Sequence, residues 1–329
     1  MEQLLGIHHV TAMTSSAEKI YEFFTYILGL RLVKKTINQD DINTYHLFFA
    51  DDRGNPGTDI TFFDFKGIPK GIKGANEISR TSFRVPSDEA LEYWVKRFEH
   101  YNINYEPIKE MFGKKVLFFE DFDEQSYALF SDENDQGVES GIPWQKGPVP
   151  LEFAITGLGP IFFRVTHKDY MGAILEKLLH MRKSKEEGRL TLYEMGKGGN
   201  GGSVIVEFVS NMREAVQGYG SVHHVAFRVP DDDVLQDWIN YMNQLGIPNS
   251  GYVDRFWFKS LYARIYPSIL FEFATDGPGF IDDEEDYETL GETLTLPPRF
   301  RDKREYVESV VRPIDTVRSN KVFEKEYFD

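Results

Sequence analysis

Four stretches of the chain repeat one order of apolar and polar positions. Each begins with alternating side chains that predict a strand, continues with an amphipathic helix, and ends in apolar runs that predict further strands. The first strands align at these residues: His9, Arg80, Pro160 and His224. At one shared offset the helices then carry these apolar residues: Phe23, Trp94, Ile174 and Trp238. A unit that recurs every 64 to 80 residues predicts an α+β fold built by internal duplication.

A segment rich in Gly, Pro and charge, DENDQGVESGIPWQKGPVPLE, separates the second copy from the third. Such a composition is typical of a connection between packed units. We therefore predict three parts: residues 1–145 with the first two copies, residues 150–280 with the last two, and residues 281–329 as a covering tail. The tail opens on an acidic run, DDEEDYET, to which we assign no chemistry.

Composition narrows the class of protein. The formal net charge of −16 argues against nucleic acid and anionic membranes as partners, since both require a basic surface. The absence of Cys excludes disulfides and thiolate ligands and favours a cytoplasmic location. Neither a signal peptide nor an apolar segment long enough for a membrane helix is evident. We expect a soluble cytoplasmic protein that acts on a small molecule, and both a monomer and a homo-oligomer stay open.

Two HHV sequences, which begin at His8 and His223, hold four of the eight His residues. In the aligned copies, His9 and His224 take the same first-strand position. Because neighbouring side chains on a strand point to opposite faces, only one His of each pair can face the interior of a barrel. The doublets therefore predict two residues of one site, each with a neighbour available to support it.

The stretch SLYARIYPSILFEFATDGPGF places Tyr262 ten residues before Glu272. Together with the two doublets and with GNPGTDITFF in the first copy, this spacing resembles the vicinal oxygen chelate superfamily, which contains glyoxalases and extradiol dioxygenases. The resemblance extends over residues 4–280 and implies four βαβββ modules that form two half-open barrels. The turn at residues 265–268 departs from the superfamily's usual sequence but keeps its length, so we expect the barrel to form.

Within that superfamily, a His in the first module with a His and a Glu in the fourth resembles the hydroquinone-type ring-cleaving dioxygenases. The resemblance implies metal ligands at His9, His224 and Glu272, with Fe(II) as the cofactor and Mn(II) as the alternative. Two His and one carboxylate on one side of a metal leave positions open for substrate and O₂. If one metal takes ligands from modules one and four, these modules share a barrel, and modules two and three form the other.

The same resemblance implies supporting roles around the metal. Tyr262 would hydrogen-bond the substrate, and Arg255 would hold a phenolate. Strand alternation, rather than the resemblance, places Thr11 on the same face as His9, where it would contact a substrate hydroxyl. His223 would transfer a proton, and His8 would orient a ligand. Each residue has a plainer alternative: a core Tyr, a solvated loop Arg, an ordinary strand Thr, or a His that points away from the metal.

A second Glu competes for the carboxylate position. SVIVEFV in the third copy aligns with SILFEFA in the fourth, which sets Glu207 in step with Glu272. The third copy carries Pro160 where a ligand His would stand, and no Tyr precedes Glu207 by ten residues. We therefore predict a structural role for Glu207.

These residues predict an Fe(II)-dependent dioxygenase that opens a hydroquinone-like aromatic ring with O₂. The first alternative is a glyoxalase-type metal-dependent lyase, isomerase or thiol transferase, whose sites more often use a fourth protein ligand. The fourth-strand positions of the first copy, near Phe62 and Phe63, are apolar, which favours the open site of a dioxygenase. The second alternative, a metal-free protein that sequesters a small aromatic, would leave the His, His and Glu set without a use.

Overall fold

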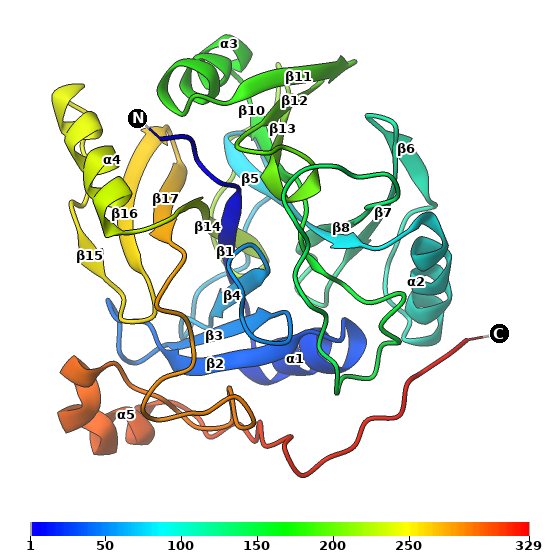
Figure 1. Ribbon diagram of the computed structural model, residues 1–329, viewed down its shortest axis with the longest axis vertical. Coiled ribbons are helices and arrows are strands. Elements are labelled where there is room, and N and C mark those ends of the chain that lie inside the picture. Colours follow the sequence, from blue (N-terminus) through cyan, green and yellow to red (C-terminus); the bar gives the residue numbers. More distant parts are fainter. Residues whose placement is uncertain (1, 329) are drawn as a thin grey trace.

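The computed structural model describes residues 2–328 and contains the four predicted units (Figure 1). The domain limits predicted at residues 1 and 329 lie outside this range. The first module consists of β1 (Ile7–Met13), α1 (Ala17–Glu22), the π-helical turn η1 (Phe23–Ile27), β2 (Arg31–Ile37), β3 (Tyr45–Ala50) and β4 (Asp59–Phe63). The second consists of β5 (Glu77–Val85), α2 (Asp88–His100), β6 (Lys109–Met111), β7 (Lys114–Glu120) and β8 (Ser126–Ser131).

A short strand, β9 (Gly157–Leu158), lies in the connection to the last two modules. The third module consists of β10 (Ile161–Val165), α3 (Lys168–Ala173), η2 (Ile174–Leu178), β11 (Arg182–Glu187), β12 (Leu190–Glu194), η3 (Asn200–Gly202) and β13 (Ser203–Phe208). The fourth consists of β14 (Ser221–Val229), α4 (Asp232–Gln244), β15 (Val253–Asp254), β16 (Lys259–Tyr266) and β17 (Ile269–Thr275). The tail adds η4 (Pro298–Lys303) and α5 (Arg304–Val310). None of the helices in residues 2–328 is both long enough and apolar enough to cross a membrane.

The strands form two sheets, and one of them joins modules from opposite ends of the chain. Modules one and four share the sheet β15-β16-β17-β14-β1-β4-β3-β2, because β1 pairs antiparallel with β14. Modules two and three share the sheet β11-β12-β13-β10-β5-β8-β7-β6 through β5 and β10. The unusual turn after β16 does not disturb its sheet, since Tyr266 still pairs with Ile269. The α+β class, the two half-open barrels and the predicted pairing of modules are confirmed.

Helices cover one face of each sheet. The two aligned tryptophans, Trp94 in α2 and Trp238 in α4, are wholly buried. The Trp238 ring lies 4.9 Å from the ring of Phe273 in β17. Ser87 and Asp231 accept hydrogen bonds from the first turns of α2 and α4 and so fix where these helices begin. These helices do not cover the opposite face of the first sheet.

The C-terminal tail crosses the first sheet and then reaches module two. Leu294 forms a bridge with Lys35 of β2, and Glu326 pairs with Arg97 of α2 at 2.7 Å. Figure 1 shows the tail passing β2 and β3 and ending beside α2. The tail therefore ties the sheet of modules one and four to a helix of the second module.

Candidate metal centre

Three strands bring the predicted ligands to one face of the first sheet. His9 lies in β1, His224 in β14 and Glu272 in β17, and β14 lies between the other two strands. Phe273 packs against α4, so its neighbour Glu272 points to the opposite face. Glu272 Oε2 lies 3.1 Å from His9 Nε2 and 2.9 Å from His224 Nε2. All three side chains are buried, and their ligand atoms lie within 4.8 Å of one another.

The donor set fits a divalent metal ion. Within residues 2–328, Glu272 Oε2 is buried and its near neighbours are His9 Nε2 and His224 Nε2, neither of which forms a well-aligned hydrogen bond to it, a costly arrangement unless a cation satisfies the oxygen. The other oxygen, Oε1, accepts a hydrogen bond of 2.5 Å from Ser260 Oγ, which leaves Oε2 facing the two imidazoles. Without a metal, burial alone would raise the pKa of Glu272, but positive charge and hydrogen bonding from His9 and His224 outweigh burial and hold the pKa well below its usual range. The carboxylate is therefore in the charged form that a metal requires.

His8 sets the tautomer of His9. His8 Nε2 lies 3.0 Å from the carbonyl oxygen of Thr275, which can only accept, so His8 Nε2 carries the proton. Burial lowers the pKa of His8 to about 3, so the ring is neutral and its Nδ1 is an acceptor. His9 Nδ1 lies 2.9 Å from that atom and donates to it. With its proton on Nδ1, the His9 ring presents the Nε2 lone pair that a metal would require, as expected for an orienting neighbour.

His223 has the equivalent contact in β14. Its Nδ1 lies 2.8 Å from His224 Nδ1, so a metal on His224 Nε2 would require His224 to donate to His223. Burial lowers the pKa of His223 to about 3. His223 also lines the cavity described next, so it contacts both a candidate ligand and the space for a substrate.

A cavity of about 570 Å³ opens beside His9 and His224, a size usual for a small-molecule site. Arg255 and Tyr262 form a pair in its lining, with Arg255 Nε donating to the Tyr262 hydroxyl at 3.1 Å. Burial and then the charge of Glu272 raise the pKa of Tyr262, so the phenol keeps its proton. Because Arg255 already occupies an acceptor position of the hydroxyl, that proton stays available to a ligand.

Thr11 is not one of the described residues that line the cavity. Its hydroxyl lies 2.8 Å from Thr61 Oγ1, and that oxygen lies 2.8 Å from His46 Nε2. His46 does line the cavity, and burial lowers its pKa well below the usual value. Thr11 therefore reaches the cavity through Thr61 and His46 rather than by the direct contact expected from its place on the strand.

The residue of module one that corresponds to Glu272 is Thr61, one position earlier than the sequence alignment suggests. Glu272 pairs with the residue two positions after His224, and Thr61 pairs with the residue two positions after His9. Strand pairing fixes this equivalence, whereas loops of unequal length shift an alignment made by counting. The hydroxyl of Thr61 is bonded to His46, so the conclusion that module one lacks a fourth carboxylate is unchanged.

Glu207 lies away from the ligand position of its own module. Ile205 pairs with the residue two positions after Pro160 and therefore takes that position, so the alignment of Glu207 was wrong by two residues. Glu207 forms ion pairs of 2.8 Å with both Arg164 and Arg189. These ion pairs agree with the structural role that the sequence predicts for Glu207.

A sequence model of the "Glyoxalase/Bleomycin resistance protein/Dioxygenase superfamily" matches residues 6–129. The chain is 40% identical over 314 residues to "Putative ring-cleaving dioxygenase MhqA" of Bacillus subtilis (strain 168), which covers 94% of this chain and 98% of the relative. The chain belongs to this superfamily. A second relative, "Chlorohydroquinone/hydroquinone 1,2-dioxygenase" of Sphingobium indicum, is 30% identical, and the alignment covers 91% of this chain and 93% of the relative.

The superfamily assignment agrees with a solved structure, that of a "putative dioxygenase" from Bacillus subtilis. It superposes with a TM-score of 0.88 at 33% identity and covers 96% of this chain and 99% of the other. The resemblance to the vicinal oxygen chelate superfamily is thus confirmed. All three relatives are dioxygenases by name, and the first is named a "putative ring-cleaving" one. Which residues of this chain bind a metal or substrate stays a prediction.

Several residues in or next to the candidate site carried no clear sequence signal. His46 is a lone His in an apolar strand and gains meaning only from its contact with Thr61. Ser260, which holds Glu272, is an ordinary strand residue in sequence. Trp257 stands two residues after Arg255 in DRFWF, and this proximity was the one clue that could have found it.

Proposed function

We propose that this protein is an Fe(II)-dependent ring-cleaving dioxygenase that opens a hydroquinone-like aromatic ring with O₂. The observation that carries the proposal is the buried group of His9, His224 and Glu272 beside a cavity with aromatic walls. Thr61 in place of a fourth carboxylate keeps the site open on one side, which is typical of non-haem Fe(II) oxygenases. The relative named for hydroquinone and chlorohydroquinone supports a para-diol as the substrate class.

Iron held by the three ligands would supply the redox centre that couples oxidation of the ring to reduction of O₂. The chain's own residues position the substrate. Arg255 pairs with Asp40 of the cavity lining at 2.9 Å and would share its charge with a phenolate oxygen, and Tyr262 donates a hydrogen bond toward the same region. The rings of Phe48 and Phe258 line the cavity and exclude water from it. The ring gains both atoms of one O₂ and loses one carbon–carbon bond, so no external reductant is needed.

The reaction itself is the direct test. Protein loaded anaerobically with Fe(II) and then mixed with air and hydroquinone should consume one O₂ per ring and form a ring-opened unsaturated acid. An oxygen electrode measures the uptake, and ¹⁸O₂ with mass spectrometry counts the oxygen atoms in the product. Cleavage of catechol without hydroquinone would keep the enzyme class and reject the substrate. Activity on a thiol adduct of a 2-oxoaldehyde, with no O₂ uptake, would instead favour a glyoxalase-type enzyme.

Replacing Tyr262 with Phe should slow turnover about 100-fold and leave the iron content unchanged, because the hydroxyl donates a hydrogen bond and is not a ligand. Iron analysis and kcat measured on the same preparation separate the two effects. Tyr266→Phe is the matched control, since Tyr266 ends the same strand and its hydroxyl bonds to Asn76 in the core. Loss of iron from Tyr262→Phe would show that the hydroxyl belongs to the metal site.

A further inference from the structure

Trp257 is a wall of the cavity that is neither a candidate ligand nor part of the pair formed by Arg255 and Tyr262. It lies in the loop between β15 and β16, and its side chain is only 2% exposed. Its ring centre is 6.4 Å from that of Phe48, another wall residue. Whatever fixes the indole therefore fixes one side of the space available to a substrate.

The loop that carries Trp257 is strained. Phe256, the residue before it, has φ of +76°, a conformation that is unfavourable for a bulky side chain and persists only where other contacts hold it. The backbone N–H of Phe256 donates to Asp254 Oδ1 at 2.7 Å, and that of Arg255 donates to the Phe258 carbonyl at 3.0 Å. The turn presents Arg255, Trp257 and Phe258 to the cavity together.

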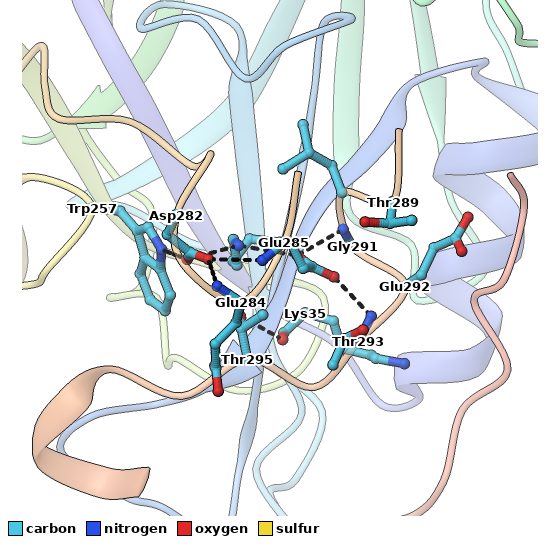
Figure 2. Close-up of polar contacts among 12 residues, drawn as sticks. Lys35, Trp257, Asp282, Glu284, Glu285, Thr289, Gly291, Glu292, Thr293 and Thr295 are labelled. Atoms are coloured by element: carbon cyan, nitrogen blue, oxygen red, sulfur yellow. Dashed lines mark hydrogen bonds and ion pairs between the residues drawn. The ribbon is translucent and has the colours of Figure 1, made fainter. Parts of the chain in front are cut away.

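The C-terminal tail supplies the contact that holds the indole. Trp257 Nε1 donates to Asp282 Oδ2 at 2.7 Å. The other oxygen of Asp282 accepts from the backbone N–H groups of Glu284 and Glu285 at 2.9 and 3.1 Å. Figure 2 shows Asp282 between the indole and this turn of the tail. Asp282 is thus fixed by its own segment and in turn fixes Trp257.

A buried lysine completes the contact. Lys34 of β2 is wholly buried, and its Nζ lies 3.1 Å from Asp282 Oδ2, 3.0 Å from Glu285 Oε2 and 5.4 Å from the centre of the Trp257 ring. Glu285 also accepts backbone hydrogen bonds from Gly291 and Thr293, as Figure 2 shows. Buried ion pairs add little stability compared with apolar packing of the same volume. Stability alone is therefore a poor reason for this cluster next to a cavity wall.

We propose that Asp282 is a positioning residue for substrate binding: anchored by Lys34, it holds the Trp257 indole in place as a wall for the aromatic ring. The proposal rests on the proposed function in so far as the ligand is an aromatic diol. A wall that contacts the ring before and during reaction contributes to binding in both states, so its loss changes KM more than kcat. The tail is then a part of the active site and more than a cover.

Kinetics of tail variants test the proposal. Asp282→Ala should raise KM for hydroquinone roughly tenfold with little change in kcat, the expected loss of one charge-assisted hydrogen bond. Asp282→Asn, which keeps an oxygen that can accept from the indole, should restore most of the lost affinity. Asp283→Ala is the matched control: Asp283 is the next residue and pairs with Arg301 at 2.5 Å on the exposed side. An equal KM for Asp282→Ala and wild type would overturn the proposal.

A double-mutant cycle separates positioning from a general effect on folding. Trp257→Phe removes the indole N–H and should itself raise KM. Adding Asp282→Ala to that variant should then have no further effect, because Asp282 has lost the group through which it acts. Equal effects of Asp282→Ala in both backgrounds would mean that it acts elsewhere, and an unchanged KM for Trp257→Phe alone would equally refute the proposal.

A measurement without substrate keeps this inference independent of the reaction. The difference in fluorescence between each protein and its Trp257→Phe counterpart isolates Trp257 from the other three tryptophans. Acrylamide should quench that signal more strongly in Asp282→Ala than in wild type or Asp283→Ala, because a released indole becomes accessible. Unchanged quenching would refute the inference that Asp282 holds the Trp257 indole in place. Absence of O₂ uptake by wild type would refute the proposed function and leave this result standing.

Discussion

Replacing Glu272 with Gln should empty the metal site and abolish O₂ uptake, whereas Glu207→Gln should leave both near wild type. The two residues stand in related strands, but Glu272 Oε2 faces His9 and His224, while Glu207 is paired with two arginines. A neutral amide cannot replace the buried charge that balances a divalent ion. Even residues that only support a ligand typically change affinity or activity by about 10- to 100-fold, so loss of a ligand should exceed that.

Metal analysis after anaerobic loading, together with O₂ uptake, measures this effect. His9→Ala and His224→Ala should match Glu272→Gln. His8→Ala should weaken binding by about 10- to 100-fold but keep most of the iron when iron is in excess, because its ring contacts His9 Nδ1 and not the ligand atom. An empty site in His8→Ala with a full one in His9→Ala would reverse the assignment of strand faces. Loss of iron in Glu207→Gln alone would move the metal to the sheet of modules two and three.

A fragment of residues 150–329 should bind no metal and show no cooperative unfolding transition. It keeps β14 and β17 but loses β1, the strand that pairs with β14 and carries His9. The exposed edge of β14 would then be free to pair with other chains. Circular dichroism during heating and metal analysis of the purified fragment measure the two parts of this result.

Co-expression with residues 1–149 is the matching control. The two halves together contain every strand of both sheets, so the complex should regain metal and a single unfolding transition. A fragment of residues 150–329 that is stable and loaded with metal by itself would contradict the role of β1 as partner and ligand strand.

The sequence predicted the part of the site that depends on local strand geometry. The doublets repeat at one aligned position, and alternation on a strand allows only one His of each pair to face inward. The resemblance to the superfamily then selected the second His of each pair, His9 and His224, and the structure brings both to Glu272. The spacing of ten residues between Tyr262 and Glu272 also corresponds to a local contact, since the two residues pair with each other on the adjacent strands β16 and β17.

Contacts between distant segments could not be predicted in this way. Thr61 and Ile205 were displaced in the alignment, because the loops between strands differ in length and only the paired strands show the true equivalence. The acidic run after Gly279 was assigned no chemistry, yet Glu285 within it is buried beside Lys34, 251 positions away. No local pattern marks such a pair, because each partner is ordinary in its own surroundings.

Because β1 pairs with β14, the first sheet can form only late in the synthesis of the chain. β1 leaves the ribosome first, and its partner follows more than 200 residues later, a wait on the order of 10 to 40 seconds at typical rates of synthesis. Modules two and three are consecutive, so their sheet can close during that wait. Two of the three candidate ligands arrive only with β14 and β17. Metal binding by the three candidate ligands would therefore have to follow nearly complete synthesis, because a nascent chain that stalls before Glu272 lacks one of them.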